Sequence, residues 1–284
     1  MNVLSESDLA HFREQGYVIV RDAVPAENRK AVIDALFAFL EMDPENPDDW
    51  YRAPLTPGGM VEMYQHQALW DNRQAPCIHG AMADLFGTEK LWVSMDRANL
   101  KPPFRADHPD YDHKGFTHWD MDTTKLATTP FGLQGVLYLT DTTEEMGGFT
   151  CVPGFHNDLE QWIKEQPETR NPRVPDLTRL PLNRKVIPVA GKAGDFVIWD
   201  KRLAHGNGRN LSDRPRLAQY ITMFPANDAN TAFREQRVSW WRDRTPPPYD
   251  WVVGDPRQRE QTQGTTAELT SLGRKLLGLE DWGT

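Results

Sequence analysis

The stretch Gly-Phe-Thr-His-Trp-Asp-Met-Asp, at residues 115–122, constrains this chain more than any other. Successive side chains of an extended strand alternate between its faces, so the strand would place His118 and Asp120 on the same side. A second histidine, His205, ends an apolar run that begins at Phe196. Two histidines and one carboxylate can hold one face of an octahedral metal and leave the other face open, an arrangement typical of non-haem Fe(II) oxygenases.

A His-x-Asp pair is common by chance, so the surrounding sequence decides its meaning. The segment 206–216 after His205 reads Gly-Asn-Gly-Arg-Asn-Leu-Ser-Asp-Arg-Pro-Arg, and residues 147–156 read Gly-Gly-Phe-Thr-Cys-Val-Pro-Gly-Phe-His. Together these motifs resemble the phytanoyl-CoA dioxygenase family of Fe(II)- and 2-oxoglutarate-dependent oxygenases. In that family a His-x-Asp pair, a Pro-Gly-x-His turn, and a distal histidine before Asn-x-Ser-x-x-x-Arg occur in this order. The resemblance extends from about Leu4 to Pro225.

The resemblance implies a metal site and the cofactors that go with it. His118, Asp120 and His205 would bind Fe(II), and the three remaining positions would take two oxygens of 2-oxoglutarate and then O2. Ascorbate is the expected reductant in vitro. His156, in the Pro-Gly-x-His turn, is expected to form a structural hydrogen bond and not to bind the metal.

The distal carboxylate of 2-oxoglutarate needs a fixed cation in a mostly apolar interior, where a guanidinium can pair with both carboxylate oxygens. Arg216 matches the family's arginine by its interval from His205, and Arg214, on the same strand face, is the alternative. Gln134 and Asn99 lie on strands expected to face the interior, so either is a candidate for a hydrogen bond to the co-substrate.

Composition limits the partners and the compartment. The formal net charge of −9 argues against a general nucleic-acid binder or a protein that binds acidic membranes. The first residues lack a basic and apolar leader, and no apolar run approaches a membrane span. A cytoplasmic protein, monomeric or homodimeric, is therefore expected, with Cys77 and Cys151 as reduced thiols.

The first 89 residues are expected to form a helical buttress for a sheet. The expected elements are a capped helix from Ser5 to Gly16, a strand at 17–20, a helix ending near Leu40, a long ordered loop over 43–72 and a helix over 76–86.

Residues 90–225 are expected to form the β-rich core. The predicted strands lie at 91–96, 131–141, 149–153, 185–190, 196–203 and 216–225, with a helix at 157–162. Short strands joined by turns and carrying a metal site predict a mainly β fold with flanking helices, a double-stranded β-helix or jelly roll of the cupin type. The whole chain, 1–284, is read as a single domain in which 226–284 is a C-terminal extension that ends in a helix over 267–277.

Three functions agree with these motifs. The first is an Fe(II)- and 2-oxoglutarate-dependent dioxygenase that hydroxylates or otherwise oxidises a small metabolite and releases succinate and CO2. The second is a cupin-like metal protein that binds or isomerises a metabolite without consuming oxygen. The third is a non-catalytic scaffold, against which the complete triad argues. Arg97, Lys101 and Arg105 suggest a polar or anionic substrate near the mouth of the site.

Overall fold

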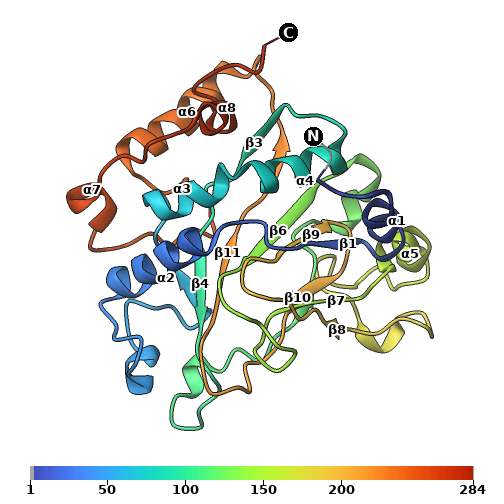
Figure 1. Ribbon diagram of the computed structural model, residues 1–284. Helices are drawn as coiled ribbons and strands as arrows, with labels where there is room; N and C mark the ends of the chain where they lie inside the picture. Colours follow the sequence, from blue (N-terminus) through green and yellow to red (C-terminus); the bar gives the residue numbers. More distant parts are fainter. Residues whose placement is uncertain (1–2, 284) are drawn as a thin grey trace.

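The strands form antiparallel sheets in this computed structural model, which describes residues 3–283 (Figure 1). The larger sheet has the order β1 (Tyr17–Val20), β9 (Phe196–Asp200), β6 (Leu133–Tyr138), β11 (Arg216–Tyr220), β4 (Ala98–Lys101) and β2 (Met60–Val61). A smaller sheet has the order β5 (Thr117–His118), β10 (His205–Asn207), β7 (Phe149–Cys151) and β8 (Ile187–Pro188). A third pair joins β12 (Met223–Pro225) to β3 (Leu91–Val93).

Helices flank these sheets. They are α1 (Glu6–Gln15), α2 (Ala26–Leu40), α3 (Gln67–Arg73), α4 (Pro76–Phe86), α5 (Phe155–Lys164), α6 (Thr231–Asp243), α7 (Arg259–Gln263) and α8 (Ser271–Leu277). Short 3-10 turns are η1 (Pro47–Tyr51), η2 (Pro109–Tyr111), η3 (Thr123–Thr128) and η4 (Leu177–Arg179). In Figure 1 α2, α3 and α4 lie in front of the larger sheet, while α6, α7 and α8 gather at one corner. None of the helices in residues 3–283 has the length and apolar character needed to span a membrane.

The N-terminal elements follow the predicted signals. Ser5 caps α1 by accepting a hydrogen bond from the Asp8 amide at 3.2 Å, and the Asp8 carboxylate accepts one from the Ser5 amide at 2.9 Å. Gly16 ends the helix in the left-handed conformation, with φ of 82°. The strand at 17–20 and the helix at 76–86 also form as predicted.

Three helices contradict the expectations. The predicted loop over 43–72 contains the start of α3, and both α6 and α7 lie in the C-terminal extension ahead of the one helix predicted there, over 267–277. Both α3 and α6 have a buried arginine within their packed face. Leu69 and Trp70 of α3 are buried as well, and Val238, Trp240 and Trp241 of α6 pack against the core. Arg73 donates to the Tyr64 carbonyl at 2.7 Å, and Arg237 donates to the Leu277 carbonyl at 3.1 Å. A buried arginine interrupts the apolar periodicity of a helix, and α3 has only 7 residues in which a period could be recognised.

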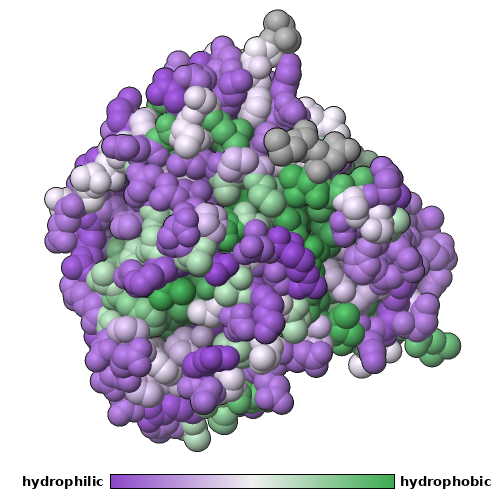
Figure 2. Space-filling view, viewed as in Figure 1, coloured by the Kyte–Doolittle hydropathy of each residue, from purple (hydrophilic) through white to green (hydrophobic). Residues whose placement is uncertain are grey.

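The two larger sheets pack against each other. A cluster of buried residues joins Val136 of β6 and Trp199 of β9, on the larger sheet, to Phe149 and Cys151 of β7, on the smaller sheet. A second, larger core lies between the other face of the larger sheet and α2, α3 and α4. The outer face seen in Figure 2 is mainly hydrophilic, with hydrophobic areas between these helices. The candidate site therefore lies between two layers whose packing fixes their positions.

Candidate metal and co-substrate site

The smaller sheet brings the two histidines together. His118 on β5 and His205 on β10 are direct register partners, and their ring centroids lie 4.7 Å apart. Gly206 permits this pairing, because a Cβ at that position would collide with the Phe116 carbonyl oxygen. The His205 Nδ1 lies 2.9 Å from the Leu203 carbonyl oxygen. An N–H donated to that carbonyl fixes the tautomer and leaves Nε2 with a lone pair for a metal.

Asp120 lies just beyond β5 and connects the two histidines. One carboxylate oxygen is 3.3 Å from the Nε2 of His118, and the other is 3.3 Å from the Nε2 of His205. Burial raises the pKa of Asp120, but its close contacts with His118 and His205 outweigh that effect and hold the pKa well below its ordinary value. The group is therefore an anionic ligand over the physiological pH range.

Gln134 holds the carboxylate from the larger sheet. Its side-chain N–H donates to Asp120 at 2.6 Å, and its oxygen accepts from the indole N–H of Trp199 at 3.2 Å. Gln134 and Trp199 are register partners on β6 and β9. The predicted hydrogen bond from Gln134 to the co-substrate stays a prediction, while the structure gives this amide a contact with a candidate ligand.

Arg216 begins β11 and is buried, with 1% of its surface exposed. Its guanidinium donates to the Asn207 side chain at 3.4 Å, while its Nε has no hydrogen-bond partner within residues 3–283. Lys101, its register partner on β4, is also buried. Burial, together with the neighbouring Arg216 charge, lowers the pKa of Lys101 to about 6. A buried guanidinium with an unsatisfied donor fits an anionic ligand.

The structure separates the two arginines and places Asn99 outside the lining of the cavity beside the triad. Arg214 is exposed and precedes β11, so the expected shared strand face is wrong. Its backbone carbonyl accepts from Asn210 at 2.9 Å, which fixes the turn that leads into Arg216. Asn99 donates to the Gly58 carbonyl at 3.0 Å and does not line the cavity beside the triad.

That cavity, of about 180 Å³, is formed by residues of both sheets and by Asp96 and Thr222. Besides the triad and Gln134, its walls contain Asp96, Asn207, Phe149, Trp199, Tyr220 and Thr222, together with Met60, Gly135 and Gly206. None of these nine was predicted as a site residue. Eight of them lie on or beside predicted strands, which does not distinguish them from core residues, and Met60 lies in the predicted loop over 43–72. A larger surface cleft of about 890 Å³, beside α4, shares no lining residue with this cavity.

The three basic residues that suggested an anionic substrate do not face the cavity. Arg97 pairs with Glu62 at 2.5 Å, Lys101 is buried beside Arg216, and Arg105 pairs with Asp107 at 2.6 Å. These three residues therefore give no support to an anionic substrate at this cavity, and the polar or anionic substrate class stays a prediction. His156 does form a structural contact, with its Nε2 3.2 Å from the Arg13 carbonyl oxygen.

The residues present fit a metal ion and an anionic co-substrate. The nitrogen and oxygen atoms of His118, Asp120 and His205 that face one another all lie within 4.8 Å. A metal ion that binds such ligands at roughly 2 Å fits among them. The unsatisfied guanidinium of Arg216 supplies the cation that a second carboxylate of 2-oxoglutarate requires.

Comparison with known sequences agrees with this geometry. The family model described as phytanoyl-CoA dioxygenase (PhyH) matches residues 12–218. A Dictyostelium discoideum protein named as a phytanoyl-CoA dioxygenase is 22% identical over 271 residues, covering 80% of this chain and 77% of that protein. An ectoine dioxygenase of Bordetella bronchiseptica is 29% identical over 157 residues, covering 51% of this chain and 50% of that protein. The alignment with the latter thus spans about half of each protein.

Solved structures share the fold at low identity. An epimerase, SnoN, in complex with Fe3+, alpha-ketoglutarate and nogalamycin RO has a TM-score of 0.55 at 22% identity, covering 78% of this chain and 83% of that one. The product of a GlcNAc-inducible gene of Candida albicans has a TM-score of 0.74 at 14% identity, covering 99% of this chain and 78% of that one. The second likeness includes the C-terminal extension that the family match leaves out.

Proposed function

Because the chain belongs to the phytanoyl-CoA dioxygenase family and is a 2-oxoglutarate-dependent non-haem iron dioxygenase, we propose that it oxidises a small polar metabolite at the cavity between its two sheets. Iron and 2-oxoglutarate, when bound, supply the oxidising chemistry, in which O2 is consumed, 2-oxoglutarate becomes succinate and CO2, and the metabolite is oxidised. Hydroxylation is the reaction that we propose for the metabolite.

The chain's own residues would bind and orient these groups. His118, Asp120 and His205 hold the metal, and the contact from Gln134 keeps the Asp120 carboxylate in place. Arg216 pairs with the distal carboxylate of 2-oxoglutarate, and Asn207, which accepts from Arg216, restrains the guanidinium. The side chains of Phe149 and Trp199, with ring centroids 4.5 Å apart, exclude water from the inner wall.

The observation that carries the proposal is the triad with a buried, unsatisfied arginine between the same two sheets. A cupin-like protein that only binds or isomerises a metabolite would need the metal ligands but no cation reserved for a co-substrate. A non-catalytic scaffold would need neither. Arg216 therefore favours the oxygenase over both alternatives.

We also propose that residues 90–225 form a double-stranded β-helix, to whose larger sheet β1 and β2 of the N-terminal part add the two edge strands. The rest of the N-terminal part, 1–89, would buttress it, and 226–284 would be an extension of the same domain. The antiparallel pairing and the similarity to SnoN support this assignment.

Anaerobic titration with Fe(II) tests the metal site without requiring turnover. One ion per chain should bind, and His118→Ala or His205→Ala should weaken binding by about tenfold or more, because each removes a direct ligand. His156→Ala is the matched histidine control and should retain the wild-type affinity. Unchanged iron binding in both triad variants would contradict the site.

A further inference from the structure

The carboxylates that line the cavity beside the triad are not matched by a lysine or arginine in its lining. The lining contains two carboxylates, Asp96 and Asp120, and no lysine or arginine. Asp120 is assigned to the metal, and Arg216, which is assigned to the co-substrate, does not line the cavity but donates to Asn207, which does. Asp96 is then the one charged side chain of the lining that is left to face a substrate.

Asp96 is only partly satisfied by the protein. Its Oδ1 accepts from the Arg97 backbone N–H at 2.7 Å and lies 3.5 Å from the Arg97 Nε. Its Oδ2 has no hydrogen-bond partner among residues 3–283, and 26% of the side chain remains exposed. One carboxylate oxygen is therefore free to accept from a ligand in the cavity.

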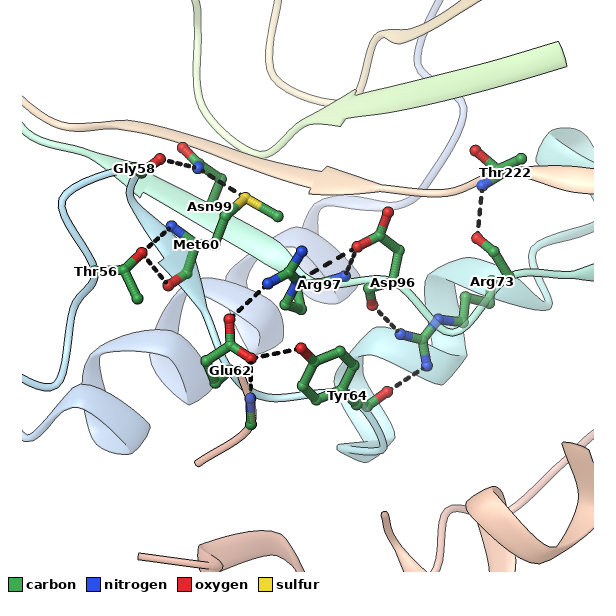
Figure 3. Close-up of polar contacts among 12 residues, drawn as sticks. Thr56, Gly58, Met60, Glu62, Tyr64, Arg73, Asp96, Arg97, Asn99 and Thr222 are labelled. Carbon is green, nitrogen blue, oxygen red and sulfur yellow. Dashed lines mark hydrogen bonds and ion pairs between the residues drawn. The ribbon is translucent and has the colours of Figure 1, made fainter. Parts of the chain in front are cut away.

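The neighbouring guanidinium is committed to another carboxylate (Figure 3). Arg97 donates to Glu62 at 2.5 Å, and both side chains are buried, with exposures of 8% and 6%. Glu62 also accepts from the Tyr64 hydroxyl at 2.5 Å and from the Gly254 amide at 2.7 Å. These contacts hold Glu62 against Arg97, so the single arginine charge is shared between two carboxylates, Glu62 and Asp96.

A hydrogen bond to the backbone of Asp96 also holds this residue in place. Its backbone carbonyl accepts a hydrogen bond from Arg73, which is fully buried. In Figure 3 Arg73 reaches this carbonyl from α3. A carboxylate on such a rigid support loses little freedom when a ligand binds, which favours specific recognition.

Burial raises the pKa of Asp96, and the neighbouring Arg97 opposes this effect. The ionised carboxylate is therefore less stable at this position than it would be in water. A cationic ligand group would offset that cost, a hydroxyl group would satisfy one oxygen without balancing the charge, and an anion would be repelled. The aromatic walls, Phe149, Trp199 and Tyr220, are also compatible with a cation lying near ring faces.

We propose that Asp96 binds a positively charged nitrogen of the substrate, so that the substrate class is a small organic cation such as an alkylammonium, amidinium or guanidinium compound. This inference rests on the proposed function, since it assigns the metal to Asp120 and the co-substrate to Arg216. It replaces the anionic class that the sequence suggested.

Three four-carbon probes of equal size but different charge test the assignment. The protein is loaded with Fe(II) and 2-oxoglutarate without oxygen, and n-butylammonium, n-butanol and n-butyrate are titrated by calorimetry. The wild type should bind n-butylammonium at least about tenfold more tightly than n-butanol, with n-butyrate weakest, because a charged hydrogen bond is stronger than a neutral one.

The variant Asp96→Asn keeps the size and one acceptor but removes the charge. It should lose at least about tenfold in n-butylammonium affinity while its affinity for 2-oxoglutarate stays within about twofold. Asp122→Asn is the matched control, because Asp122 is an acidic residue near the metal ligands whose carboxylate caps η3 and does not line the cavity. It should leave all three probe affinities within about twofold.

Three outcomes would overturn the assignment of Asp96. They are no binding of n-butylammonium, equal or better binding of n-butanol or n-butyrate by the wild type, and an Asp96→Asn variant that binds n-butylammonium as the wild type does. The ranking of probes needs only the wild type, so it holds even if the variant does not fold. A protein that fails to bind Fe(II) or 2-oxoglutarate would instead contradict the proposed function.

Discussion

Arg216 has a buried guanidinium, and its Nε has no hydrogen-bond partner within residues 3–283. Arg216→Ala should therefore keep Fe(II) affinity but weaken 2-oxoglutarate binding by about a hundredfold, since the truncation leaves a buried carboxylate without its partner. Calorimetric titration of 2-oxoglutarate into the iron-loaded protein measures the change. The exposed Arg214 supplies the control, and Arg214→Ala should behave as the wild type. An unchanged Kd in Arg216→Ala would remove this arginine from the site.

His156 acts on the fold and not on the metal. Its ring joins α5 to the carbonyl of Arg13 in α1, at 3.2 Å. His156→Ala should lower the free energy of unfolding by about 1–3 kcal/mol, because it removes a buried hydrogen bond and leaves a space. Urea denaturation measures this, with the exposed His11→Ala as a control that changes stability by less than about 0.5 kcal/mol. Weaker iron binding without a loss of stability would give His156 a role at the metal instead.

At the residue scale, the sequence predicted those candidate site residues whose spacing along the chain is set by the chemistry that they share. His118, Asp120, His205 and Arg216 follow a fixed order along the chain, and the structure brings all four between the same sheets. Asn99 and the basic residues near the mouth were placed by strand alternation alone. Alternation predicts which face of a strand a side chain lies on, but it does not predict which residue the side chain will pair with. Arg97 forms an ion pair with Glu62, which belongs to a distant segment of the chain.

At the element scale, Glu260 on α7 ties the C-terminal extension to the segment before α3. Its carboxylate accepts from the amides of Tyr64 and Gln65, each at 2.6 Å. Burial nevertheless raises its pKa from 4.5 to about 7. Between these pH values the folded protein holds a proton that the unfolded chain has released. This group therefore lowers stability as pH rises from about 4.5 to about 7, by up to roughly 3 kcal/mol.

Glu260→Gln removes that titration. Urea denaturation at pH 5 and at pH 7.5 should show a decrease in stability with pH that is smaller in the variant than in the wild type, by about 1–3 kcal/mol. The same comparison in Glu268→Gln, an exposed residue of the same extension, should match the wild type. Parallel pH profiles for wild type and Glu260→Gln would show that Glu260 titrates normally in the folded protein.

The elements that sequence predicted are those with local signals. The cap at Ser5, the glycine at Gly16 and the apolar strand at 17–20 each specify structure within a few residues. By contrast α6 is capped by Asn230 but depends on Arg237, whose guanidinium donates to carbonyls of β3 and α8. A buried arginine that is satisfied only by distant segments gives no local signal for a helix, although Val238, Trp240 and Trp241 of α6 also pack against the core.

At the scale of the whole molecule, function depends on two sheets meeting at one end. The smaller sheet carries the histidines, and the larger sheet carries Gln134 and Arg216. Asp96, just before β4, adds the group that we assign to the substrate. The motifs implied a β fold with a metal site, but the charge of the cavity follows only from the packing of residues far apart in the chain.

Conversion of 2-oxoglutarate to succinate is the most direct test of the central claim. The purified protein is incubated with 2-oxoglutarate, ascorbate and O2, with or without Fe(II), and succinate is quantified by mass spectrometry. We expect Fe(II)-dependent succinate from the wild type and from Asp122→Asn, and none above background from His205→Ala, because that variant lacks a metal ligand. The account would be contradicted by undiminished succinate in His205→Ala, or by no succinate from a wild-type protein that binds both Fe(II) and 2-oxoglutarate.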